Sequence, residues 1–233
     1  MNVLILGSGP NVLKCREWGK APFDYIVAIN NAWSVRLDWD FLIHPDDFPI
    51  VRQPKDFSQK QKIIRAIDYV PVQNRFGGFV YAGGTMAFTA GYWALGALQP
   101  NVIAFLGCDM TYDAQKTHFY GQGAPDPLRK DISLRSLEAK SARFQTLAAR
   151  EGCAVLNLSE DPSRLTFPRG TPARSAACLP LQYDQRLIAA ALQKEDQLGY
   201  FVPSGKYWKE EDRFDVEKID ALDQLWLKAG QPL

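Results

Sequence analysis

The stretch NVLILGSGPNV, residues 2–12, decides the fold. It begins with an apolar run and continues directly into two glycines that flank a serine and precede a proline. This pattern is typical of a buried parallel strand that ends in a tight turn with exposed backbone N–H groups. The glycines allow a ligand to approach the backbone closely, and Pro10 is suited to the first position of a helix. We therefore predict a strand, a glycine loop and a short helix at residues 2–18.

The glycine loop is a candidate phosphate site, because the N-terminus of the following helix attracts negative charge. A purely structural turn is the alternative, since Val12 and Leu13 stand where the third glycine of a Rossmann fingerprint would be. The residues alone leave both interpretations open. The candidate nucleotide-binding residues of this loop are Gly7, Ser8, Gly9, Pro10 and Asn11.

Four further apolar runs predict other strands of the same sheet. They cover residues 25–29, 41–43, 101–106 and 153–159. Residues 85–98 are apolar most of the way round a helix, which predicts a buried helix, and residues 132–151 predict an amphipathic one. Residues 62–67 and 69–72 fit a helix or a strand equally well. This order of strands and helices predicts a doubly wound, mostly parallel α/β sheet of the Rossmann-like type.

Polar residues stand where such a sheet binds its ligands, just after the carboxyl ends of the strands. Asn30 and Asn31 follow the second strand, and Asp109 follows the strand at 101–106. Gly84 and Thr85 precede the buried helix, whose N-terminus is a second candidate anion site. We expect these five residues to contact a nucleotide, with ordinary turn residues as the alternative for the two asparagines.

A polar and aromatic loop at residues 111–130 carries the candidate catalytic residue, His118. Loops of this length inside a compact domain are commonly lids or binding loops. A histidine near its ordinary pKa can take a proton at neutral pH, although a lone histidine is more often a packed or surface residue. His44, at the end of the third predicted strand, is the alternative base. Tyr112 and Tyr120 are candidate donors to a leaving phosphate.

We expect no metal site. The four cysteines are widely separated and include no CxxC pair, which argues against both zinc and a disulfide framework. Residues 38–40, Asp-Trp-Asp, match the DxD pattern of many metal-dependent nucleotide-sugar enzymes. That pattern precedes a predicted strand, however, whereas ligand groups in such sheets follow the strands. A solvated turn is therefore the favoured interpretation.

The composition is that of an ordinary globular protein, with 233 residues, 46% hydrophobic and 23% charged. The formal net charge of +1 provides no overall attraction to nucleic acid, so we expect no nucleic-acid partner. No apolar run approaches a membrane span, and the chain starts in a predicted strand without a leader, so we expect a cytoplasmic protein. Peripheral membrane association and a homo-oligomer stay open.

The composition shifts near residue 169. We therefore predict an α/β domain at residues 1–168, which holds the candidate nucleotide-binding residues, and a C-terminal helical extension or lid at residues 169–233. Two helical stretches are expected in the extension, at about 181–194 and 216–229.

Several short motifs, taken in order, resemble the bacterial sialyltransferases of glycosyltransferase family 42 and, more distantly, the DUF115 (MptE-like) proteins. The likeness runs over most of residues 2–167. The matching stretches are LGSGPN (6–11), AINN (28–31), GGT (83–85), FLGCDM (105–110), THFYG (117–121), SLE (136–138) and VLNL (155–158).

This resemblance implies that residues 1–168 form a Rossmann-like nucleotide-sugar-binding domain. It further implies a metal-independent enzyme that binds a CMP-sugar at the carboxyl ends of the strands. The residues that match the family's nucleotide-binding positions are Ser8, Asn30 and the pair Gly84-Thr85. The family's general base is a histidine of a His-x-x-Gly-His run. In this sequence His118 stands at the first histidine of that run, and Gln122 stands at the second. The resemblance thus implies transfer of a CMP-activated acidic sugar to a glycan acceptor, in cell-surface glycan synthesis and without a further cofactor.

Two other functions are compatible with the same residues. A non-catalytic nucleotide-binding protein could have kept the scaffold without the base. A DUF115-like diphosphate transferase would require Mg²⁺ and would give a metal role to Asp46, Asp47 or Asp109.

Overall fold

The structure is a computed structural model that describes residues 1–111, 117–121 and 129–232. Within these residues, six strands form one all-parallel sheet in the order β4-β3-β2-β1-β5-β6. The strands are β1 (Asn2–Leu6), β2 (Tyr25–Ile29), β3 (Phe41–Ile43), β4 (Lys62–Ile64), β5 (Val102–Leu106) and β6 (Ala154–Asn157). The predicted fold class, a doubly wound α/β sheet of the Rossmann-like type, is confirmed.

The chain has α-helices, 3-10 helices and one described π-helix. The label α marks an α-helix, and η marks a 3-10 helix, except that η4 is the π-helix. They are η1 (Pro10–Glu17), η2 (Asn30–Ser34), η3 (Ile50–Arg52), α1 (Ala66–Asn74), α2 (Phe79–Ala82), α3 (Met86–Trp93), η4 (Ala94–Leu98), η6 (Ile132–Leu134), α4 (Leu137–Arg150), α5 (Pro172–Ser175), α6 (Gln185–Leu198), η7 (Tyr207–Lys209), η8 (Glu211–Arg213) and α7 (Val216–Ala229).

Strand β1 lies in the middle of the sheet because its side chains are apolar on both faces. Residues 3–6 are completely buried, as expected for a parallel sheet covered on both sides. Ile5 pairs with Val27 of β2 on one side and with Phe105 of β5 on the other. The loops that follow β1, β2 and β5 are thereby brought to one edge of the sheet.

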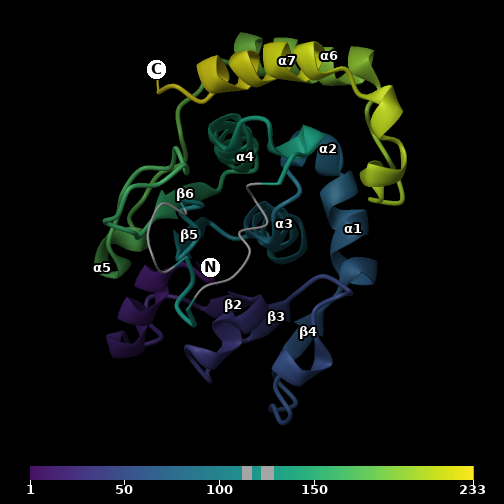
Figure 1. Ribbon diagram of the computed structural model, residues 1–233. Coiled ribbons are helices and arrows are strands. Elements are labelled where there is room, and N and C mark those ends of the chain that lie inside the picture. The colour runs from purple at the N-terminus through teal and green to yellow at the C-terminus, as the bar shows by residue number, and fades with distance from the viewer. Residues whose placement is uncertain (112–116, 122–128, 233) are drawn as a thin grey trace.

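The two faces of the sheet are covered differently. Helices α1, α3 and α4 cover one face, where Val3 and Ile5 belong to the larger hydrophobic core (Figure 1). The short helices η1 and η2 cover the other face, where Leu4 and Leu6 pack with Val12 in the smaller core. This division is the doubly wound arrangement that the order of the elements predicts.

The C-terminal helices α6 and α7 lie outside α4, as a further layer on the same side of the sheet (Figure 1). Two buried ion pairs join these helices to α4. Lys140 Nζ lies 2.6 Å from Asp223 Oδ1, and Arg143 Nε lies 2.7 Å from Glu195 Oε1. The indole N–H of Trp226 also donates to Glu195 Oε1, over 2.7 Å. The extension is therefore packed on the domain through charged side chains as well as apolar ones.

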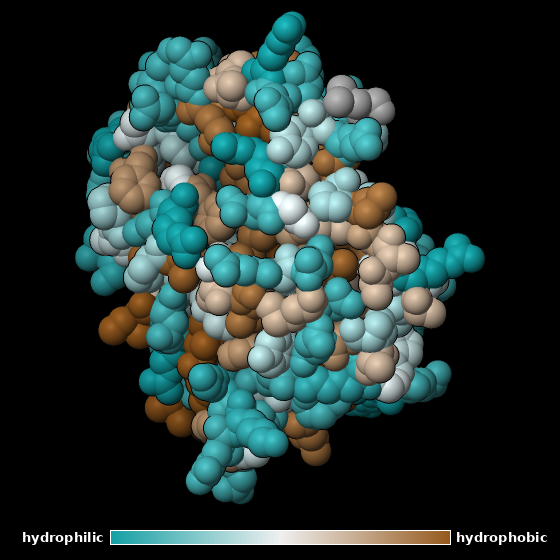
Figure 2. Space-filling model, turned by 180° about the vertical axis from the view of Figure 1, so that it is seen from behind, coloured by the Kyte–Doolittle hydropathy of each residue, from teal (hydrophilic) through white to brown (hydrophobic). Residues whose placement is uncertain are grey.

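Seen from behind, the surface is a mixture of hydrophilic and hydrophobic residues, with hydrophobic ones visible in the middle of this face and at its lower left (Figure 2). The exposed large hydrophobic side chains include Leu37, Ile50, Val51 and Ile67. Scattered exposed residues of this kind are normal on globular proteins. Among the described residues, no helix is long and apolar enough to cross a membrane.

Candidate functional site

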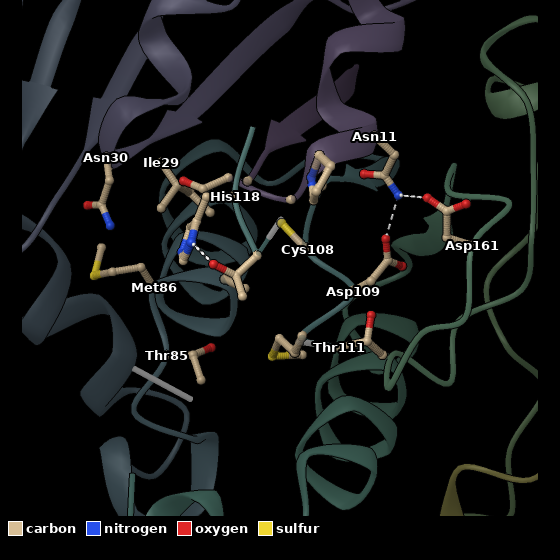
Figure 3. A pocket seen from close by; sticks show the side chains of 18 of the residues that line it. Asn11, Ile29, Asn30, Thr85, Met86, Cys108, Asp109, Thr111, His118 and Asp161 are labelled. Atoms are coloured by element: carbon tan, nitrogen blue, oxygen red, sulfur yellow. Dashed lines mark hydrogen bonds between the residues drawn. The ribbon is translucent and has the colours of Figure 1, made fainter. Parts of the chain in front are cut away.

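A pocket of about 240 Å³ opens at the carboxyl edge of the sheet (Figure 3). The chain runs outward from β1 to β4 and then returns to the other side of β1 as β5. The order of the strands therefore reverses between β1 and β5, which is where doubly wound sheets bind their ligands. The loops after these two strands form the floor of the pocket.

Most of the predicted site residues line this one pocket. They are Gly7, Ser8, Gly9, Pro10, Asn11, Asn30, Thr85, Asp109, His118 and Tyr120. The ends of β1, β2 and β5, the start of α3 and the segment 117–121 each contribute. Residues far apart in the sequence thus meet at the edge that the strand pattern indicates.

Other predicted residues lie elsewhere. Asn31 and Gly84 are neighbours of lining residues but are not among the described residues that line the pocket. His44 is 2% exposed and is not among the described residues that line the pocket; its Nδ1 atom lies 2.8 Å from the carbonyl oxygen of Pro45. Tyr112 and Gln122 lie outside the described residues.

The glycine loop differs from its predicted form. The amide groups of Gly7 and Gly9 do not face a ligand, because they donate to the carbonyl oxygens of Leu106 and Gly107, each over 2.8 Å. A Cβ atom on Gly7 would lie 2.3 Å from the carbonyl oxygen of Gly107. The glycines therefore allow the loop after β1 to pack against the loop after β5. This requirement cannot be read from either stretch of sequence alone.

The N-terminus of α3 provides the electropositive part of the pocket. Thr85 caps this helix, and its hydroxyl accepts a hydrogen bond from the amide of Phe88 over 3.3 Å. Thr85, Met86 and Ala87 line the pocket. Amide groups in the first turn of a helix carry a partial positive charge and suit an anion. This helix start, predicted as a second anion site, faces the pocket.

Asn11 lies at the centre of a polar network next to the pocket. Its Nδ2 atom lies 2.7 Å from Asp109 Oδ2, 2.7 Å from Ser159 Oγ and 2.9 Å from Asp161 Oδ2. Asn157 Nδ2 donates to the other oxygen of Asp109 over 3.1 Å. Asp109 is 6% exposed, so the carboxylate that was predicted to contact a ligand is largely occupied by two amides.

His118 lies on the pocket wall in a short local structure. Its backbone forms an isolated bridge with Gly121, and the amide of Phe119 donates to the carbonyl oxygen of Ser8 over 2.9 Å. His118 Nδ1 lies 2.8 Å from Thr117 Oγ1, and its ring stacks on Tyr120 at 5.0 Å between centroids. Burial lowers the pKa of His118 from its ordinary value of 6.5. The imidazole is therefore neutral at pH 7, the form that can accept a proton.

The pocket also contains residues that were not predicted. Asp161, Thr117 and Met86 are among them. Asp161 follows β6, so it could have been found by the same rule that selects residues after the carboxyl ends of strands. Thr117 and Met86 carry no comparable signal beyond their position next to a predicted residue.

The carboxylates among the described lining residues make this part of the pocket acidic. Asp109 and Asp161 are among its described lining residues, and none of these is Lys or Arg. In the described part of the chain, no group of three or more His, Cys, Asp or Glu residues is arranged to hold a metal ion.

Comparison of the chain with models of known protein families, with curated proteins and with solved structures found no match.

Proposed function

We propose that this protein is a metal-independent glycosyltransferase that takes its sugar from a CMP-activated acidic sugar, with His118 as the general base. The observation that carries the proposal is the position of His118, neutral at pH 7, on the wall of a pocket that the start of α3 also lines. The choice of a CMP-activated donor rests on the resemblance of the sequence motifs to family 42 sialyltransferases.

The proposed reaction is a direct displacement at the anomeric carbon of the donor sugar. The acceptor hydroxyl oxygen forms a bond to this carbon, the bond to the phosphate oxygen breaks, and CMP leaves with the bonding electrons. His118 takes the proton of the acceptor hydroxyl. Thr117 Oγ1, 2.8 Å from Nδ1, can accept a hydrogen bond from an Nδ1–H group. In that tautomer the lone pair that takes the proton is on Nε2.

The leaving phosphate needs donors, because negative charge develops on it in the transition state. The backbone N–H groups at the start of α3 and the hydroxyl group of Tyr120 are suitable, since Met86, Ala87 and Tyr120 line the pocket. The same role for Tyr112 stays a prediction.

The proposal is tested by assaying purified protein with CMP-sialic acid and related CMP-keto-deoxy sugars in the presence of EDTA. His118→Gln should lower kcat by about 10²–10⁴-fold and leave the Kd for CMP within about twofold, because a base acts only during the reaction. His44→Gln is the matched control and should turn over normally. Since burial lowers the pKa of His118, the acidic limb of the pH–rate profile should have its midpoint below pH 6.5.

Three results would contradict the proposal. Equal turnover by His118→Gln and the unaltered protein would remove His118 from the reaction. Loss of activity in EDTA that Mg²⁺ restores would favour the diphosphate transferase. CMP binding without turnover of any CMP-sugar would favour a non-catalytic nucleotide-binding protein.

A further inference from the structure

We infer that Asp109 and Asp161 fix the Asn11 side-chain amide with its oxygen toward the pocket, so that the ligand must place a hydrogen-bond donor against Asn11. This inference rests on the proposed function only in taking the ligand to be a nucleotide-sugar. It assigns the glycine-loop end of the pocket to a hydroxyl or N–H group of that ligand, and not to its phosphate.

The first step is the environment of the Asn11 nitrogen. Three oxygen atoms surround Nδ2 within 2.9 Å, and two of them belong to the carboxylates of Asp109 and Asp161. The amide has two protons, which can serve these carboxylates. The third oxygen, Ser159 Oγ, also accepts from the backbone amide of Asp161, so it does not depend on a proton from Asn11.

The second step is that the opposite orientation is unfavourable. An ionised carboxylate has no proton to donate. Rotating the amide by half a turn would therefore set the oxygen of Asn11 against the oxygens of Asp109 and Asp161, without a hydrogen bond. Asp109 is 6% exposed, so water screens this repulsion poorly. Figure 3 shows the resulting arrangement, with the nitrogen of Asn11 turned toward both carboxylates and its oxygen turned away from them.

The third step is that the Asn11 oxygen has no donor in the described protein. Asn11 is 9% exposed and lines the pocket, and its Oδ1 atom is buried without a hydrogen-bond partner. A buried acceptor without a donor is costly, and most are paired in folded proteins. A ligand N–H or O–H group would supply the missing hydrogen bond, whereas a phosphate oxygen would repel both Oδ1 and the nearby carboxylates.

A second acceptor lies on another side of the pocket. Asn30, which follows β2, also has a buried Oδ1 atom without a partner among the described residues. Asn30 has a φ of 51°, in the left-handed region that few non-glycine residues adopt. Figure 3 shows Asn11 and Asn30 on opposite sides of the view. Two acceptor oxygens suit a ligand part that is rich in hydroxyl or amino groups, and the start of α3 is left for the phosphate.

The test exchanges the amide of Asn11 and the carboxylate of Asp109 between the two positions. Titration calorimetry measures the affinity of each variant for two probes, the neutral nucleoside cytidine and CMP. Asn11→Asp should weaken cytidine binding by about tenfold or more, because the new carboxylate is repelled by Asp109 and Asp161. Asp109→Asn should weaken it by a smaller factor, because the amide of Asn11 is no longer held in one orientation. The double exchange, Asn11→Asp with Asp109→Asn, should return the affinity to within about threefold, since an amide again donates to a carboxylate.

The matched control is Asn157→Asp. Asn157 donates to the same carboxylate of Asp109 over 3.1 Å but is not among the described lining residues. This variant should lower the melting temperature about as much as Asn11→Asp and leave the Kd for cytidine within about threefold. If Asn11→Asp binds cytidine normally, or if the double exchange binds no better than Asn11→Asp, the inference is overturned.

A measurement without ligand separates this inference from the proposed function. The side-chain amide protons of Asn11, assigned by NMR through their loss in Asn11→Asp, should exchange slowly with solvent and should exchange faster in Asp109→Asn. A failure of the protein to bind either probe would refute the proposed function, and the amide protons would still decide the orientation of Asn11. Fast exchange that Asp109→Asn leaves unchanged would overturn the inference.

Discussion

Gly7 is the residue on which the junction of β1 and β5 depends. Its own amide donates to the carbonyl oxygen of Leu106, and a Cβ atom at this position would lie 2.3 Å from Gly107 O and 2.6 Å from Cys108 Sγ. Contacts shorter than 3.0 Å require something to move, and here the closest atom belongs to the backbone. The role of this glycine is therefore structural, whatever the ligand of the pocket is.

Gly7→Ala should lower the free energy of unfolding by about 1–3 kcal/mol, as overpacking does in a tight site. Gly19→Ala is the matched control, because a Cβ atom at Gly19 would have nothing within 4 Å. The control should stay within about 1 kcal/mol of the unaltered protein. Urea unfolding followed by circular dichroism measures both changes, and equal stability of the two variants would contradict this explanation.

The strands and several helices could be predicted from local patterns. The apolar runs at residues 25–29 and 41–43 and the helical pattern at 216–229 have the same bounds in the structure. These elements are buried on one or more faces, so their side chains record their environment directly. Asn30 and Asp109 could be placed at the pocket for a related reason, because Asn30 directly follows β2 and Asp109 is the third residue after β5.

Other elements depend on contacts that a local pattern does not contain. Residues 132–151 were predicted as one helix, but α4 starts at Leu137, because the Ser136 hydroxyl caps it by accepting from the amide of Ala139. Residues 62–72 were ambiguous and hold both a strand, β4, and a helix, α1, which contains Pro71. The network around Asn11 joins residues up to 150 positions apart, since it reaches Asp161. No pattern in a single stretch could show these pairings.

Helix α4 depends on a buried ion pair with α7. Lys140 and Asp223 have side chains that are 1% and 2% exposed. Burial raises the pKa of Asp223, and the Lys140 ammonium group opposes this shift. Two charges in such a place are stable only as a pair, because each would be desolvated without compensation if the other were removed.

Lys140→Met and Asp223→Leu should each lower the free energy of unfolding by about 3–5 kcal/mol, because each leaves one buried charge without its partner. The double variant should be as stable as the unaltered protein or more stable, since a well-packed apolar pair avoids the desolvation of both charges. Chemical unfolding of all four proteins gives the coupling energy. Additive losses in the double variant would show that the two side chains do not act as a pair.

At the scale of the whole molecule, the pocket and the C-terminal layer of α6 and α7 are built from different parts of the chain. The described residues that line the pocket end at Asp161, whereas α6 and α7 pack on α4. No residue of the extension is among the described residues that line the pocket, and both the lid role and the division at residue 168 stay predictions. Because the extension makes buried contacts with α4, we predict that the first 168 residues need it in order to fold.

A chain that ends at residue 168 should lose cooperative thermal unfolding, because α4 would lose the carboxylates of Glu195 and Asp223 and the Trp226 ring that lies against Arg143. Circular dichroism melting and size-exclusion chromatography would show a broad transition and aggregation. A chain that ends at Gly230 is the control and should melt as the full chain does, since it keeps all of α7. A sharp, unchanged transition in the shorter chain would mean that the first 168 residues fold independently.

The central position of β1 has a consequence for synthesis on the ribosome. Strands β2, β3 and β4 follow β1 closely along the chain, but its other neighbour, β5, starts only at Val102. The N-terminal amino group of Met1 donates a hydrogen bond to Asn101 Oδ1 next to these two strands, and the two residues are 100 positions apart. At a translation rate of about 5–20 residues per second, one edge of β1 has no neighbour for roughly 5–20 s. During that interval the nascent chain presents an open apolar strand, which is the kind of surface that chaperones bind and that aggregation uses.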